Sequence, residues 1–145
     1  MAEKIDRRVY VVYIRTTPAK LWRAVTSGTV TPYYYFRSTV KIALKKGGDL
    51  KYVMPDGKTV IVGKVLESKP GKKLVHTFKT IGWNANEPAS RVTYDITKQG
   101  ATCCLTLTHD RLGRSPGTAR DVNGGWPVIL SGLKTWLETG KKLFR

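Results

Sequence analysis

The chain ends in one amphipathic helix that follows a long series of strand-like segments, and this order strongly limits its possible folds. The helix carries apolar residues at the three-and-four spacing that places them on one face: Trp126, Ile129, Leu130, Leu133 and Leu137. Gly140 supplies the left-handed residue that often follows a last helical turn. The start is open: Asn123 could cap the helix, with Pro127 in its first turn, or an earlier turn could begin near Thr118. Such a helix can cover one face of a sheet.

The strand-like segments have a period of two from Ser38 onward, after a first strand expected over residues 8–15. Turn residues separate them at 46–49, 55–58, 69–72 and 98–100. This pattern of strand-like segments and turns predicts a meander of antiparallel strands joined by hairpins.

Charged residues mark the water-facing side of each expected strand, so their neighbours should point inward. The predicted inward residues are Val40, Ile42, Leu44, Leu50, Tyr52, Met54, Ile61, Gly63, Val65, Leu74, His76, Phe78, Val92, Tyr94, Ile96, Cys103, Leu105, Leu107 and His109. Four of these have polar tips: Tyr52, His76, Tyr94 and His109. A buried polar group without a partner costs on the order of 1 to 3 kcal/mol, so they need hydrogen bonds, water or a ligand. A sheet gripping the helix around them would form a mostly apolar cavity.

Two short helices are expected between the first and second strands. Thr17 is a good N-cap and Pro18 a good first helical residue, and this helix should stop at residues 27–28. Residues 31–32 could open a second helix that carries the aromatic cluster 33–36. Four aromatic side chains cannot all point one way on a short helix, so some should line the cavity mouth; we select Tyr35, with Trp22 and Trp126.

The 145 residues suit a single domain, 1–145, with its core at about 8–143. No stretch reaches the roughly 18 apolar residues of a membrane span, and the first residues lack the apolar core of a signal peptide, so we expect a cytoplasmic protein. Adjacent Cys103 and Cys104 should point to opposite faces of a strand and stay reduced.

The formal net charge of +16 marks a basic protein and raises the possibility of an anionic partner. The lysines are spread over strands and turns rather than gathered in a tail or helical stripe. Charge alone gives only non-specific nucleic-acid binding, and no aromatic and basic reading motif accompanies it, so nucleic acid ranks last among the partners.

A series of motifs runs along the chain in a characteristic order, at residues 18–22, 31–36, 63–67, 69–74, 90–94, 105–109 and 124–140. In this order they resemble the START-like, helix-grip (SRPBCC) superfamily, over about residues 8–143. Within it, the chain resembles stand-alone domains similar to the C-terminal domain of the heat-shock protein 90 ATPase activator. The resemblance implies an α+β, helix-grip (Bet v-like) fold. About seven antiparallel strands would form a curved sheet around the long C-terminal helix, with two short helices between strands 1 and 2.

The resemblance leaves three classes of function open. Members of the superfamily carry lipids, hormones and other apolar molecules, or act as cyclases and hydrolytic enzymes, and fold does not choose among them. The first hypothesis is a binding domain for an apolar or aromatic small molecule, and the second is a module for an acidic protein partner or chaperone. The third is an enzyme of the cyclase or hydrolase kind that uses His76 and His109.

We expect binding rather than catalysis, because the predicted inner face has no Asp or Glu for acid and base work. A set of Cys103, His76 and His109 lacks the short spacings of metal motifs and is interpreted as structural, so no catalytic residue, metal or cofactor is expected. The predicted ligand-binding residues are Trp22, Tyr35, Tyr52, His76, Phe78, Tyr94, His109, Trp126 and Leu130. The ligand's identity and the oligomeric state are left open.

Overall fold

A computed structural model describes residues 6–144 of the chain. Its strands are β1 (Arg8–Ile14), β2 (Thr39–Ile42), β3 (Asp49–Val53), β4 (Thr59–Lys69), β5 (Lys73–Thr80), β6 (Ser90–Gln99) and β7 (Thr102–Asp110). Its helices are α1 (Pro18–Thr26), the short 3-10 helix η1 (Thr31–Tyr33) and α2 (Pro116–Thr139).

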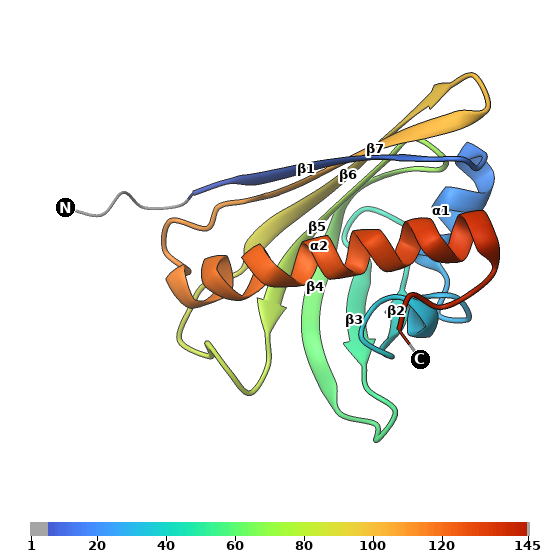
Figure 1. Ribbon diagram of the computed structural model, residues 1–145. Helices are drawn as coiled ribbons and strands as arrows, with labels where there is room; N and C mark the ends of the chain where they lie inside the picture. Colours follow the sequence, from blue (N-terminus) through green and yellow to red (C-terminus); the bar gives the residue numbers. More distant parts are fainter. Residues whose placement is uncertain (1–5, 145) are drawn as a thin grey trace.

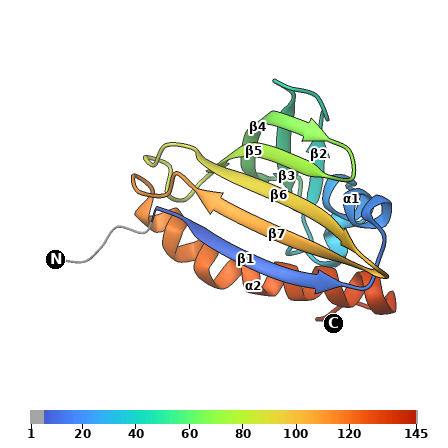
Figure 2. The same ribbon diagram turned by 90° about the horizontal axis from the view of Figure 1, so that it is seen from above.

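The seven strands form one antiparallel sheet in the order β1-β7-β6-β5-β4-β3-β2. Strands β2 to β7 follow one another as hairpins, and β1 completes the sheet beside β7. Figures 1 and 2 show the sheet curving around α2, which runs along its concave face, with α1 at one end. This confirms the predicted helix-grip fold.

The period-two interpretation holds best in β6 and β7, where buried residues alternate with half-exposed ones from Ser90 to Ile96 and throughout β7. Val92, Tyr94, Leu105 and Leu107 are buried on the side that meets α2. The apolar face of α2 lies against them and buries Trp126, Ile129, Leu130 and Leu133. Cys103 is buried and Cys104 half-buried, and both are free thiols, as expected from their adjacent positions.

The second strand is shorter than the alternation suggested. β2 ends at Ile42, and Leu44, predicted to point inward, is 42% exposed. The chain turns away at this point because the amide of Gly47 donates to the carbonyl of Val65, which draws the 43–48 loop toward β4.

Helix α2 begins at Pro116, so the cap at Asn123 and the first-turn place of Pro127 are both wrong. Pro127 lies inside the helix, three residues after Gly124. In a helix interior a glycine costs about 1 kcal/mol and a proline about 3 kcal/mol relative to alanine. The buried face of α2 offsets these costs, since tertiary packing supplies most of the stability of such helices. Gly140 ends the helix with a φ of 72°, as predicted.

The first short helix matches its prediction, because the amide of Lys20 donates to the Thr17 side chain at its N-terminus. The second does not carry the aromatic cluster. η1 stops at Tyr33, and Phe36 and Arg37 adopt positive φ values of 49° and 64°, which a helix cannot continue through. This bend separates the four aromatic rings.

Gly63 lies where the β4–β5 pairing is interrupted between Val62 and Val65. A Cβ atom at this position would overlap the carbonyl oxygen of Thr77. Because Gly63 has no side chain, β4 and β5 can approach closely between Ile61 and Val65, two buried residues of β4.

Candidate functional site

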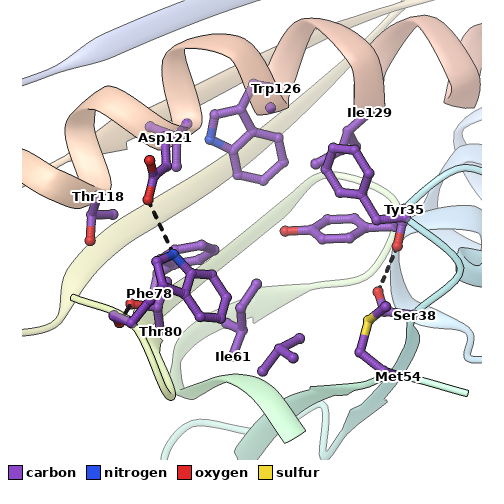
Figure 3. A pocket seen from close by; sticks show the side chains of 15 residues that line it. Tyr35, Ser38, Met54, Ile61, Phe78, Thr80, Thr118, Asp121, Trp126 and Ile129 are labelled. Carbon is purple, nitrogen blue, oxygen red and sulfur yellow. Dashed lines mark hydrogen bonds between the residues drawn. The ribbon is translucent and has the colours of Figure 1, made fainter. Parts of the chain in front are cut away.

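An apolar cavity of about 320 Å³ lies between the ends of β4 and β5 and the first half of α2 (Figure 3). Its aromatic lining residues are Tyr35, Phe36, Phe78, Trp83 and Trp126, and its aliphatic ones are Met54, Val60, Ile61, Val122 and Ile129. Ser38, Thr80, Thr118, Asp121 and Gly125 complete the lining. The walls therefore come from segments far apart in the sequence.

Gly125 helps to keep this space open. A Cβ atom built there would have only the ring of Phe36 nearby, at 4.0 Å. Any longer side chain would extend into the cavity, because Gly125 itself lines it. Gly124 has open space around it and does not belong to the lining.

The loop between β5 and β6 closes one side of the cavity and is tied to α2 by two carboxylates. Asp121 accepts hydrogen bonds from Trp83 Nε1 at 3.1 Å and from Asn84 Nδ2 at 2.9 Å, and Figure 3 shows the first of these. Glu87 accepts from the amides of Gly117 at 2.6 Å and Thr118 at 2.9 Å. Glu87 thus satisfies donors at the N-terminus of α2 that have no partner within the helix.

Burial alone raises the pKa of Glu87. The hydrogen bonds from Thr118 and Gly117, together with the positive charge of Arg120, outweigh that effect and leave its pKa below the ordinary value. The ionised carboxylate is the form that those helix amides stabilise.

Behind the cavity wall, a chain of hydrogen bonds runs from α2 into the sheet. Trp126 Nε1 donates to His109 Nδ1 at 3.0 Å, so His109 carries its hydrogen on Nε2 and donates it to Ser90 Oγ at 2.6 Å. Ser90 in turn donates to the carbonyl of Phe78 at 3.2 Å. Burial, and secondly the neighbouring His76, lower the pKa of His109 to about 3, so its ring stays neutral. The chain fixes Trp126, whose ring forms part of the cavity wall.

A second buried polar group consists of three tyrosines. The ring of Tyr35 stacks on Tyr52 with 4.3 Å between centroids. Burial raises the pKa of Tyr52 to about 12, and hydrogen bonding with Tyr94 and Tyr35 partly offsets this effect. Burial also raises the pKa of Tyr35 and Tyr94 well above the ordinary value, so all three remain protonated.

His76 is also enclosed. Its Nδ1 lies 2.8 Å from the carbonyl oxygen of Thr77 and donates to it, while Nε2 is buried with no partner among the described residues. Burial lowers the pKa of His76 to about 4. Neither histidine lines the cavity.

The structure distributes the nine predicted ligand-binding residues among three places. Tyr35, Phe78 and Trp126 line the cavity. Directly behind this lining, or in the core beside it, lie the buried side chains of Tyr52, His76, Tyr94, His109 and Leu130. Trp22 is separate: it lies with Pro18, Pro70 and Ile96 at the α1 end. Of the nine predicted residues, three therefore line the cavity and five lie buried behind or beside its walls.

Sequence reasoning missed the loop between β5 and β6, and with it Trp83, as well as Asp121 on α2. The available signal was an isolated tryptophan in a polar, glycine-containing loop, where an aromatic side chain has no core of its own to enter. Asp121 carries no such signal, because the sequence leaves the start of this helix open between Thr118 and Asn123.

Over residues 6–144, no cluster of three or more histidine, cysteine or acidic side chains is arranged to hold a metal ion. Within the same range, no helix has the length and apolarity needed to span a membrane. The single-domain organisation and the cytoplasmic location stay predictions.

Comparisons with solved structures show where this fold has been seen. DynU16, from the dynemicin biosynthetic locus, matches with a TM-score of 0.79 and 20% identity, over 95% of this chain and 49% of that chain. This chain thus spans about half the length of DynU16. An HSP90 activator from Plasmodium falciparum matches with a TM-score of 0.75 and 21% identity, over 92% of this chain and 96% of that chain.

The Aha1 dimer of Colwellia psychrerythraea matches with a TM-score of 0.72 and 20% identity, over 94% of this chain and 99% of that chain. At these identities the likenesses show the fold. A search of curated protein sequences found no match.

The family itself is shown by the sequence. The family model described as "Activator of Hsp90 ATPase homolog 1-like protein" matches residues 15–138, which run from the end of β1 to the last turn of α2. With the START-like fold described above, this match shows that the chain belongs to the activator of Hsp90 ATPase homolog 1-like family.

Proposed function

We propose that the chain binds an apolar or aromatic small molecule in the cavity between its sheet and α2. The observation that carries this proposal is the cavity of about 320 Å³ with five aromatic and five aliphatic side chains in its lining. Small-molecule sites are typically concave, mostly apolar and supplied with a few placed polar groups. Ser38, Thr80, Thr118 and Asp121 are such groups here.

The lining favours binding over catalysis. Its one acidic residue is Asp121, and no described histidine or cysteine belongs to it. His109 has both ring nitrogens engaged, and His76 lies behind the wall. The hypothesis of histidine-based catalysis required these rings to face the cavity, and we do not propose it.

The test uses a pair of adjacent glycines on α2. Gly125→Leu would place an isobutyl group in the cavity, whereas Gly124→Leu would place the same group in open space. Both changes replace a helical glycine with a better helix former, so both variants should fold at least as stably as the wild type.

Calorimetric titration with naphthylmethanol, an aromatic alcohol that fits an apolar pocket, measures the effect. We expect Gly125→Leu to weaken binding by at least about tenfold, equivalent to about 1.4 kcal/mol, and Gly124→Leu to leave it unchanged. Equal affinity in both variants would place the ligand elsewhere, and absence of binding by the wild type would count against the proposal.

The outer face of the sheet supports a second candidate function, binding of an acidic protein partner. Lys41 on β2 and Lys51 on β3 are directly opposed in the ladder, and neither forms an ion pair within residues 6–144. Like charges in this position destabilise a sheet, and an acidic partner would relieve that repulsion. The HSP90 activator similar to this chain makes a chaperone one partner of this kind to test.

A polyglutamate peptide tests this surface. Binding should weaken as salt rises and fall further in a Lys41→Gln, Lys51→Gln double variant. The control is a Lys98→Gln, Lys72→Gln variant, which removes the same charge from the β4–β5 turn and the end of β6. Equal loss in both variants would show an effect of net charge only.

A further inference from the structure

We propose that the cavity selects ligands that carry a hydrogen-bond donor, and above all a positively charged amine, and that it discriminates against carboxylates. This inference rests on the proposed binding function and names the class of ligand. It comes from the direction of each hydrogen bond made by the polar side chains in the lining.

The three lining residues with aliphatic hydroxyls all direct their hydrogens into the protein. Ser38 Oγ donates to the Tyr35 carbonyl at 2.6 Å, and Thr80 Oγ1 donates to the Trp83 carbonyl at 2.6 Å. Thr118 Oγ1 donates to Glu87 Oε1 at 2.8 Å. Each hydroxyl has one hydrogen, so what remains for a ligand is its oxygen lone pairs.

The ring of Tyr35 adds an aromatic surface beside these acceptors. It stacks on the ring of Tyr52, with 4.3 Å between centroids. Figure 3 shows the Tyr35 ring extending into the cavity below Trp126.

Asp121 is the one charged residue of the lining, in a chain with 26 Lys and Arg against 10 Asp and Glu. Trp83 Nε1 and Asn84 Nδ2 both donate to its Oδ2 and hold the carboxylate at the cavity rim. Oδ1 has no partner among the described side chains and can accept from a ligand. No described Lys, Arg or His belongs to the lining, so nothing there would neutralise an anionic ligand.

The net charge of +16 acts in the opposite direction and attracts anions from a distance. At physiological ionic strength the Debye length is about 8 Å, which screens lysines on the far face of the sheet. Hydrogen bonds and ring contacts act at shorter range than this. The faces of Trp and Tyr rings also attract cations. For a ligand inside the cavity, the local acceptors therefore decide the selectivity.

Three probes with one aromatic skeleton test the inference: naphthylmethylamine, naphthylmethanol and naphthoate, titrated by calorimetry at neutral pH. We expect the amine to bind tightest and the carboxylate weakest, with about tenfold or more between them, as for a charge-assisted hydrogen bond against an unpaired anion. Naphthoate binding as tightly as the amine would overturn the inference, although it would support the proposed binding function. If none of the three binds, the proposed function itself fails.

Asp121→Asn separates the local charge from the shape of the site, because an asparagine oxygen can still accept from Trp83 and Asn84. We expect this variant to weaken amine binding by about fivefold while naphthylmethanol binding changes little, since the carboxylate is partly solvated. Asp95→Asn is the matched control: it removes the same charge from the outer face, where Asp95 lies near Lys73. Amine selectivity that is undiminished in Asp121→Asn, or that falls equally in Asp95→Asn, would also overturn the inference.

Discussion

Trp126 belongs to both the cavity and the buried polar chain. Its ring lines the cavity, and its indole N–H is held by the neutral ring of His109. The position of this wall therefore depends on a histidine that keeps one nitrogen free of hydrogen. Protonation of His109 would replace an acceptor with a donor facing the indole N–H.

The two buried histidines predict how stability depends on pH. Their pKa values lie at about 3 for His109 and about 4 for His76, below the value of 6.5 expected in the unfolded chain. Below that value the unfolded chain binds protons that the folded one does not, so stability falls as pH falls. From about pH 7 to about pH 5, each histidine should cost about 1 to 2 kcal/mol of unfolding free energy.

Urea unfolding of the wild type and of His109→Gln, which retains a donor and an acceptor, measures this dependence. The variant should show a shallower fall in stability over that pH range, whatever its stability at neutral pH. His76→Gln should flatten the dependence by a similar amount. An unchanged slope in both variants would contradict the neutral buried rings.

At the scale of elements, α2 remains helical through three interior glycines, Gly124, Gly125 and Gly132, and through Pro127, all of which disfavour helix. Its N-terminus also lacks a capping hydrogen bond from Ser115, the residue in the cap position. Glu87 satisfies the first amides instead, from a loop thirty residues earlier in the chain. The first turns of α2, which form one cavity wall, thus depend on the β5–β6 loop.

Glu87→Gln should lower the unfolding free energy by about 1 kcal/mol, since it weakens a charged cap. Because the pKa of Glu87 is lowered on folding, the stability it contributes is present above the unfolded-state pKa and is lost as pH falls through the folded-state value. Hydrogen exchange should show faster opening at residues 118–122. The control is Glu67→Gln, which alters a half-exposed carboxylate paired with Lys69. Equal effects of the two changes would show that Glu87 has no special role at the helix.

The strands could be predicted from the sequence because their signal is local: charged residues on one side fix the orientation of their neighbours. This is why the alternation in β6 and β7 was correct. The start of α2 could not be found in the same way, since its cap is a tertiary contact with Glu87. Likewise, the end of β2 depends on the hydrogen bond between Gly47 and Val65 rather than on the residues of β2.

At the scale of the whole molecule, the cavity arises only when the curved sheet, the β5–β6 loop and α2 come together. The alternation of residues along β5 predicted that Phe78 points inward, and the apolar spacing along α2 predicted the same for Trp126. Neither pattern could distinguish a residue that lines the cavity, such as Phe78, from one that supports its wall, such as Tyr94. The pairing of Trp83 with Asp121, 38 residues apart, lay beyond any local pattern.

The charge distribution predicts how the whole molecule responds to salt. A net charge of +16 produces self-repulsion, so added salt should stabilise the fold. Lys51→Glu should raise stability by about 0.5 kcal/mol and reduce the salt dependence, because it converts the pair with Lys41 from repulsive to attractive. Lys98→Glu changes the net charge equally without facing a lysine in the ladder. If the two variants gave identical thermal unfolding curves at every salt concentration, only the net charge would determine the change in stability.

The most direct test of the central claim is a nuclear magnetic resonance titration of the isotope-labelled protein with naphthylmethanol. If the ligand binds between the sheet and α2, the largest changes in chemical shift should occur at Ile61, Phe78, Val122 and the indole of Trp126. These changes should develop at the same ligand concentration in Gly124→Leu and should need at least about tenfold more ligand in Gly125→Leu. Chemical-shift changes concentrated around Lys41 and Lys51 on the outer face, or an unchanged titration in Gly125→Leu, would contradict the claim.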